Sequence, residues 1–203
     1  MGLAAQKIEI YKDKYNYADY LSWDDNQRWE IIDGEVYDMS PAPIESHQAI
    51  SGELSVQIGN FLSENQKKCK LYAAPFDVRF PEGVKDNEKI IDVVQPDIVV
   101  ICDRSKIDRR GCIGAPDFII EILSPYTAHK DHTIKRDLYE KNGVKEYWII
   151  DPSNKIVLVY LLDETKAYSK PTIHSQQGKL KITVLPELEI DLDAVFKAPV
   201  FDF

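Results

Sequence analysis

Two short stretches of the chain are apolar at almost every position. Residues 96–102 (PDIVVIC) and 117–123 (DFIIEIL) consist mainly of Val, Ile, Leu and Phe, with few charged residues among them. Strands that are apolar on both alternating faces are typical of the centre of a sheet that is covered on both sides. The pattern therefore predicts two buried central strands.

Two longer stretches have the apolar spacing of helices. Ser46 is expected to be the N-cap of a helix that ends near residue 65. Residues 130–142 form the second predicted helix, with Gly143 as the residue that ends it. In the first helix, the apolar residues that recur every third or fourth position are Ile50, Leu54, Ile58, Phe61 and Leu62.

Shorter elements complete the expected fold. Asn16 should cap a short helix over residues 17–23, and Asp33 with Gly34 should form the turn of a hairpin over residues 28–39. Strands interrupted by two main helices indicate a mixed α/β fold, and 203 residues suit one domain with residues 1–14 as an N-terminal extension. The other expected segments are strands at 71–80, 146–151, 156–162 and 180–184, and a short C-terminal segment at 188–196.

Composition and charge narrow the class of protein. Hydrophobic residues make up 44% and charged residues 29% of the chain, as in soluble globular proteins. We expect a cytoplasmic protein without a membrane partner, because no apolar run approaches the roughly 20 residues that cross a bilayer. With 34 acidic and 25 basic side chains the formal charge is −9, which argues against a general affinity for nucleic acid but allows a local basic cleft.

The three cysteines have irregular spacing. There is no CxxC pair and no histidine beside any of them, so neither a disulfide framework nor a cysteine-based zinc site is expected. Cys102 lies in an apolar run and should pack as a small hydrophobic residue. Cys69 lies among lysines and should be exposed.

Asp97 and Glu121 are charges in strands that otherwise suit a packed core. Burying an isolated carboxylate is unfavourable, so each must pair with a cation, bind a metal or stay protonated. Pro96 lacks a backbone donor and is tolerated where a strand begins, which places Asp97 at one end of the sheet. A cleft can open there.

Lys135 and His47 are directed toward the same region. At about 100° per residue, Lys135 falls within the apolar arc of its helix together with Ile134, Leu138 and Tyr139. His47 lies three residues before a core position of the first long helix. Asp97, Glu121 and Lys135 are explained equally well by a buried structural salt bridge and by a catalytic site.

A series of short motifs runs along the chain. In order, they are WEIIDGE at 29–35, Ser40–Pro41 through His47, QPDI at 95–98, EILSP at 121–125, Lys135 with Leu138–Tyr139, Gly143–Val144, and EYWIIDP at 146–152. Together they resemble the motifs of the Uma-type restriction endonuclease family, which is found mainly in bacteria and is part of the PD-(D/E)XK nuclease superfamily. The resemblance covers about residues 15–196.

The resemblance implies a restriction-endonuclease-like core, a central mixed sheet flanked by helices. Asp97 then matches the Asp of the PD motif and Glu121 the second acidic residue. The commonest superfamily pattern has lysine at position 123, where this chain has Leu123. The resemblance implies that Lys135 takes that role, with Lys130 as the competing candidate.

The chemistry that follows is hydrolysis of a phosphodiester bond in DNA with Mg²⁺, or Mn²⁺ in its place. Asp97, Glu121 and, by resemblance, the backbone carbonyl of Ile122 would bind the metal. Lys135 would act on the attacking water and stabilise negative charge. His47 and Glu30 are candidates for substrate-contacting or supporting residues.

Three functions remain open on the residues alone. The first is a Mg²⁺-dependent endodeoxyribonuclease. Its acidic charge leaves two alternatives: a second subunit completes the basic groove, or the substrate is short or delivered by a partner. The resemblance favours a homodimer, because nucleases of this superfamily often pair to cut two strands. The second is a non-catalytic nucleic-acid or protein interaction module that retains the nuclease fold, which Leu123 and the acidic charge favour. The third is a carboxylate-pair hydrolase acting on sugars, which the lysine disfavours.

Overall fold

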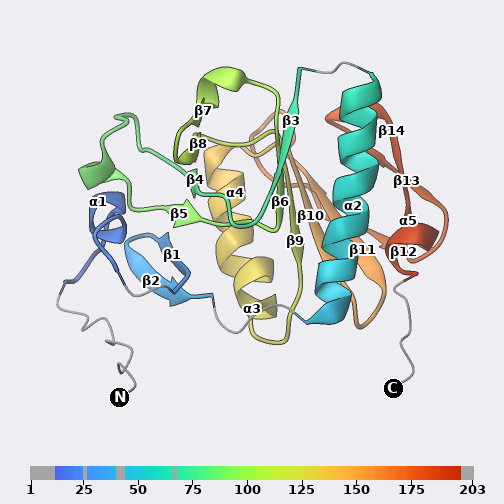
Figure 1. The fold of residues 1–203 in the computed structure, drawn as a ribbon, viewed down its shortest axis with the longest axis horizontal. Coiled ribbons are helices and arrows are strands. Elements are labelled where there is room, and N and C mark those ends of the chain that lie inside the picture. The colour runs from blue at the N-terminus through green and yellow to red at the C-terminus, as the bar shows by residue number, and fades with distance from the viewer. Residues whose placement is uncertain (1–11, 25–26, 40–43, 66–67, 198–203) are drawn as a thin grey trace.

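A mixed six-stranded sheet forms the centre of the protein. The computed structural model describes residues 12–24, 27–39, 44–65 and 68–197 (Figure 1). In the central sheet β9 and β10 are parallel and the other neighbours are antiparallel. The strands, in spatial order, are β12 (Thr172–Ser175), β11 (Ile156–Leu161), β10 (Glu146–Asp151), β9 (Phe118–Ile122), β6 (Ile98–Ile101) and β3 (Lys70–Ala73).

Helices cover both faces of this sheet, which confirms the mixed α/β prediction. Helix α2 (Glu45–Glu64) places its buried Ile and Leu side chains against the face that includes Ile98, Ile120 and Ile122. Helix α4 (Arg136–Asn142) packs Leu138 and Tyr139 against the opposite face. Figure 1 shows α2 running along the sheet. The alternation of apolar side chains along β6 and β9 supplies both cores.

A second sheet of six short strands shares a core with α4. The hairpin β13 (Lys179–Ile182) and β14 (Leu185–Asp191), followed by α5 (Leu192–Val195), packs on the α2 side instead. The strands of the second sheet, in spatial order, are β2 (Glu35–Asp38), β1 (Trp29–Ile32), β5 (Val93–Val94), β4 (Val78–Arg79), β8 (Gly111–Ile113) and β7 (Ile107–Asp108).

Local sequence signals explain several boundaries. Asn16 caps α1 (Tyr17–Tyr20) through a reciprocal capping box with Asp19. The Asp33–Gly34 turn has positive φ at both residues, 49° and 77°, as a two-residue hairpin requires. Gly143 ends α4 in the left-handed conformation. These elements confirm the predicted short helix, hairpin and helix end, although α1 stops before residue 23.

Other boundaries differ from the predictions. The expected strand 71–80 is two strands in different sheets, because Pro75 lacks an N–H donor and interrupts it between β3 and β4. Ser46 is not the N-cap of α2, since Ile44 holds that position and makes no side-chain cap bond. The strand β12 was not predicted, because its exposed polar sequence has no apolar alternation.

A disulfide joins Cys69 and Cys102, contrary to the prediction that the cysteines do not pair. The antiparallel pairing of β3 and β6 puts Lys70 opposite Ile101, so the next pair outward is Cys69 and Cys102. The two cysteines are 33 positions apart in the sequence, so their spacing alone gives no sign that they are neighbours. Cys112 is buried and not disulfide-bonded.

Residues 1–11 of the predicted N-terminal extension lie outside the described residues, as do Ser40 and Pro41. Lys14 bonds to Asp33 at 2.7 Å, which attaches the following segment to the hairpin turn. Within the described ranges, no helix combines the length and the apolar character that spanning a membrane requires.

Candidate active site

Asp97 and Glu121 meet at one end of the central sheet. β6 and β9 are antiparallel with Ile98 opposite Ile120, so the adjoining pair along the ladder is Asp97 and Glu121. Because side chains alternate along a strand, both carboxylates lie on the face that α4 covers. The sheet therefore brings together the two acids that the sequence singled out.

Asp97 is fixed by main-chain and side-chain partners. Its Oδ2 accepts a hydrogen bond of 2.7 Å from the backbone N–H of Ile122. The same oxygen lies 3.2 Å from Nε2 of His47, which comes from the first turn of α2. Nδ1 of His47 is buried without a hydrogen-bond partner in the described part of the chain. Asp97 itself is 19% exposed, so the carboxylate remains accessible.

Glu121 is almost fully buried. Its Oε1 accepts hydrogen bonds from Nζ of Lys135 at 2.9 Å and from the hydroxyl of Tyr139 at 2.6 Å. Burial raises the pKa of Glu121 to about 8 even though the Lys135 ammonium lowers it, and the charges of Asp131 and Asp97 add to the rise. The ionised form of Glu121 therefore needs more positive charge than Lys135 supplies.

Lys135 lies among three carboxylates and is 2% exposed. Its Nζ is 2.8 Å from Oε1 of Glu30, 2.9 Å from Oε1 of Glu121 and 3.6 Å from Oδ1 of Asp131. Burial alone would lower the pKa of Lys135, but these carboxylates outweigh it and raise that pKa well above its ordinary value. Lys135 is therefore a permanent cation in this environment.

The helix that carries Lys135 is irregular at this point. Between α3 (Ala128–Lys130) and α4, residues Asp131–Lys135 form a π-helical segment, a feature that often occurs at functional sites. The segment buries Asp131, whose Oδ1 accepts no hydrogen bond from the described residues. The apolar arc predicted the direction of Lys135. Asp131 was missed, although its spacing of four residues from Lys135 is a signal for a pair.

Glu30 holds both candidate lysines from the opposite side. It lies on β1 with no exposed surface, and its Oε2 is 2.6 Å from Nζ of Lys130. Its Oε1 accepts a hydrogen bond of 3.0 Å from the backbone N–H of Gln95. Burial favours a higher pKa for Glu30, but the ammonium groups of Lys135 and Lys130 outweigh burial and lower that pKa to about 2.

These side chains surround a pocket of about 180 Å³. Asp97, Glu121, Ile122, Lys130, Lys135 and His47 all line it, whereas Glu30 lies behind the wall. Lys135 contacts both Glu121 and Glu30, whereas the ion pair of Lys130 within the described residues is with Glu30. The structure thus separates the two lysines by their partners. The other lining residues are Arg28, Met39, Ile44, Gln95, Ser124, Pro125, Tyr126, Thr127 and Asp131.

The donor atoms suit a hard divalent cation. Contacts from the described residues occupy Oδ2 of Asp97 and Oε1 of Glu121, which leaves the second oxygen of each carboxylate. No three His, Cys, Asp or Glu side chains within the described ranges form a metal-binding group. Mg²⁺ commonly uses only one or two carboxylates and completes its shell with water, so this donor set fits Mg²⁺ better than Zn²⁺.

The net charge of the groups around the pocket also favours a bound cation. Four buried or half-buried carboxylates, those of Glu30, Asp97, Glu121 and Asp131, face the two ammonium groups of Lys130 and Lys135. The guanidinium group of Arg28 lines the same pocket, so the formal charge of the site is −1. A buried excess of negative charge is unfavourable unless protons or a cation neutralise it.

The chain shares its fold and sequence features with known proteins. Residues 17–193 match the Uma2 family, described as "Putative restriction endonuclease". A crystal structure of a "putative nuclease belonging to DUF820" from Anabaena variabilis superposes with a TM-score of 0.70 over 90% of this chain and 97% of that chain, at 22% identity. An uncharacterized protein of Synechocystis is 26% identical over 145 residues, which are 70% of this chain and 71% of that protein.

The family match covers most of the chain, so the protein belongs to the Uma2 family of restriction-endonuclease-like proteins. The similarity in structure confirms the predicted nuclease-like fold.

Proposed function

We propose that this member of the Uma2 family is a metal-dependent endonuclease that hydrolyses phosphodiester bonds of DNA. One observation carries the proposal. Asp97 and Glu121 lie opposite each other at the end of β6 and β9, and the ammonium group of Lys135 is 2.9 Å from Glu121 in the same pocket. Two carboxylates and a cation at one site are the groups that phosphodiester hydrolysis requires.

Asp97 and Glu121 would hold Mg²⁺, or Mn²⁺ in its place, together with the backbone carbonyl of Ile122. Such a cation, when bound, neutralises charge on the phosphate and lowers the pKa of a bound water. The excess of negative charge and the raised pKa of Glu121 both favour a divalent cation there. The backbone N–H of Ile122 orients Asp97 for this role.

Lys135 would orient the attacking water and stabilise the negative charge that develops on the phosphate. Its pKa is raised well above the ordinary lysine value, so the side chain acts as a cation and not as a base. Lys130 would contribute positive charge at the wall of the pocket through its bond to Glu30. Lys135 is the better candidate for the catalytic lysine because it touches Glu121.

Glu30 and His47 would support these groups. Glu30 has no exposed surface, so it positions the two lysines and does not touch the substrate. His47 bonds to Asp97 and lines the pocket, which lets it orient the carboxylate. A homodimer would let a second subunit complete a binding groove that a single chain with a charge of −9 does not form alone.

The test is cleavage of supercoiled plasmid and of circular single-stranded DNA with Mg²⁺ or Mn²⁺. Asp97→Asn, Glu121→Gln and Lys135→Met should each lower the rate by at least about 100-fold. Asp117→Asn is the matched control, because Asp117 is also buried and also accepts a backbone N–H, that of Cys102, but at the opposite end of the β6–β9 pair.

Calorimetry of Mg²⁺ binding on the same samples separates catalysis from folding. Asp97→Asn and Glu121→Gln should lose binding, whereas Lys135→Met and Asp117→Asn should retain it. A wild-type protein that neither binds a divalent cation nor cleaves either DNA would refute the proposal and favour the interaction module.

A further inference from the structure

The mouth of the pocket is aromatic and apolar. Tyr126 is 77% exposed and Ile44 is 60% exposed, and both line the pocket together with Met39. Exposed large hydrophobic side chains that gather beside a polar site mark a binding surface. The proposed roles of Asp97, Glu121 and the two lysines do not explain an exposed aromatic side chain at the entrance of the pocket. An aromatic ring as exposed as that of Tyr126 is able to stack against a flat partner that enters there.

The pocket is narrow and its polar groups are deep. Its volume is about 180 Å³, and Glu121 and Lys135 are only 3% and 2% exposed. A scissile phosphate must therefore enter the pocket to reach both groups. The phosphates of a duplex lie on its outer surface, but its bases are paired and stacked inside. Only an unpaired strand can therefore place a base on Tyr126 while the neighbouring phosphate enters the pocket.

A groove continues from the pocket along α2. A hollow of about 430 Å³ shares Arg28, His47 and Asp97 with the pocket. Small polar side chains of α2, Ser51 and Ser55, form its opposite wall. The groove therefore starts at the proposed metal ligand Asp97 and is lined further along mainly by small residues.

A further hollow beside Pro75 contains an aromatic pair and two arginines. Pro75 lines both the groove and this hollow of about 410 Å³, whose other lining residues include Tyr72, Phe76, Arg109 and Arg110 together with Asp77 and Asp108. Tyr72 and Phe76 stack with ring centroids 4.2 Å apart at 7°, a platform that a base can extend.

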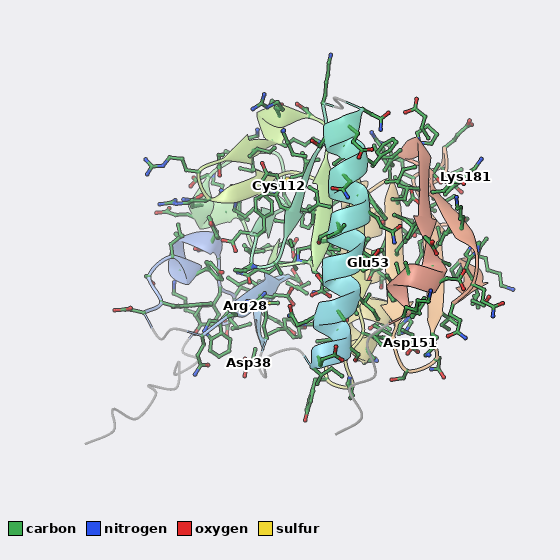
Figure 2. The ribbon with its side chains drawn as sticks, turned by 45° about the vertical axis from the view of Figure 1, so that its right-hand side comes forward. Arg28, Asp38, Glu53, Cys112, Asp151 and Lys181 are labelled. Carbon is green, nitrogen blue, oxygen red and sulfur yellow. A yellow bond between two sulfur atoms is a disulfide. The ribbon has the colours of Figure 1, made fainter. Side chains whose placement is uncertain are left out.

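Arg109 and Arg110 are exposed at the turn between β7 and β8. The charge of the neighbouring Asp108 is already balanced by Arg79, at 2.6 Å. Neither Arg109 nor Arg110 forms an ion pair with another described residue, so both guanidinium groups are available to phosphates. In Figure 2, Arg28 and Cys112, the residue just after this turn, lie on one side of α2, and Lys181 lies on the other.

We propose that the substrate is a single-stranded nucleic acid, with one base stacked on Tyr126 at the pocket mouth and the backbone following the groove past Arg28 to Arg109 and Arg110. This inference rests on the proposed nuclease function and specifies its substrate. The acidic chain then needs no broad basic face, because local arginines and aromatic rings bind the unpaired strand.

Binding is measured without cleavage, by fluorescence anisotropy in EDTA. The probes are a labelled DNA strand of about 15 nucleotides, the RNA strand of the same sequence, and the corresponding DNA duplex. Both single strands, or one of them, should bind at least about tenfold more tightly than the duplex. The comparison of the two strands identifies which sugar the groove prefers.

Matched variants test the two ends of the path. Tyr126→Ala should weaken single-strand binding about tenfold and Tyr126→Trp should restore it, since stacking is the cause. The control Ile173→Ala removes a similarly exposed side chain from β12 and should change nothing.

The double variant Arg109→Ala/Arg110→Ala should reduce the slope of log affinity against log salt by about 1.4, or about 0.7 for each phosphate that an arginine no longer neutralises. Lys179→Ala/Lys181→Ala removes the same charge from β13 and should leave the slope unchanged.

The outcomes separate this inference from the proposed function. If the protein cleaves DNA but binds the duplex as tightly as the single strands, the inference is wrong and the nuclease function stands. The inference is also wrong if Tyr126→Ala binds the single strand as the wild type does. If neither DNA is cleaved while single-strand binding still depends on Tyr126 and the two arginines, the binding surface stands and the proposed catalysis fails.

Discussion

Replacing Lys135 by methionine tests whether its ammonium group compensates the buried carboxylates in the folded state. The substitution keeps most of the side-chain volume and removes the charge that lies 2.8 Å from Glu30 and 2.9 Å from Glu121. Breaking a buried ion pair on one side is strongly destabilising, because it leaves an uncompensated charge. We expect the free energy of unfolding to fall.

The magnitude follows from Glu30. Burial raises the pKa of Glu30, but Lys135 and Lys130 lower it from 4.5 to about 2. At about 1.4 kcal/mol for each tenfold change in proton affinity, ionised Glu30 stabilises the folded protein by about 3 kcal/mol at neutral pH. The charge of Lys135 is the largest single effect that lowers this pKa. The variant should therefore lose about 2–3 kcal/mol, and more if Glu121 also becomes harder to ionise.

The pH dependence gives the sign of the effect. Glu30 has a lowered pKa in the folded protein, so its contribution is present above pH 4.5 and is lost as the pH falls toward 2. Glu121 has a raised pKa, so its ionisation costs stability as the pH rises toward 8, and more so without Lys135. The difference between wild type and Lys135→Met should therefore be largest near pH 8 and narrow below pH 4.5.

The assay is urea denaturation followed by tryptophan fluorescence, in EDTA, at several pH values. Lys141→Met is the control, because Lys141 lies on α4 and pairs with Glu82 while both side chains are more than half exposed. That variant should change stability far less. A Lys135→Met protein as stable as the wild type at pH 8 would show that the carboxylates are neutralised by protons and not by the lysine.

Three further predictions concern Glu121 and the backbone near the groove. The affinity for Mg²⁺ should fall by up to about tenfold for each pH unit below 8, because the raised pKa of Glu121 means that the metal must displace a proton. Calorimetry in buffers of different ionisation enthalpy measures the number of protons released. An affinity that does not change between pH 6 and pH 8 would contradict the prediction. Tyr139→Phe should lower stability by about 1–3 kcal/mol in the same urea assay, since the buried Oε1 of Glu121 loses its 2.6 Å donor; an unchanged transition midpoint would argue against that bond. Gly111→Ala should lower the melting temperature markedly, since Gly111 has φ of +127° and an added Cβ would lie 2.2 Å from the carbonyl oxygen of Asp77. Gly83 also has positive φ but open space around it, so Gly83→Ala should lower the melting temperature less.

The sequence predicted the parts of the site that depend on local pattern. Apolar runs with one misplaced charge located Asp97 and Glu121, because a carboxylate inside such a run is too unfavourable to be accidental. Helical spacing located Lys135, even though Lys135 is the last residue of a π-helical segment.

Features that depend on distant pairing could not be predicted in this way. The disulfide requires the register of β3 against β6, and the full burial of Glu30 requires the second sheet to pack against α4. The hydroxyl of Tyr139 was counted as part of an apolar arc, although it bonds to Glu121. The apolar spacing of one segment predicts which of its residues are buried, but not which distant segment packs against them.

The acids and the lysine belong to different structural elements. Asp97 and Glu121 are fixed to the strongly bonded centre of the sheet, while Lys135 reaches them from a helix that is held by side-chain packing. Proteins open in parts, and an irregular helix separates from a sheet at lower free energy than the sheet itself melts. We expect hydrogen exchange to show the amides of residues 128–142 opening before those of β6 and β9, so that heat disassembles the site while the core of the protein is still folded.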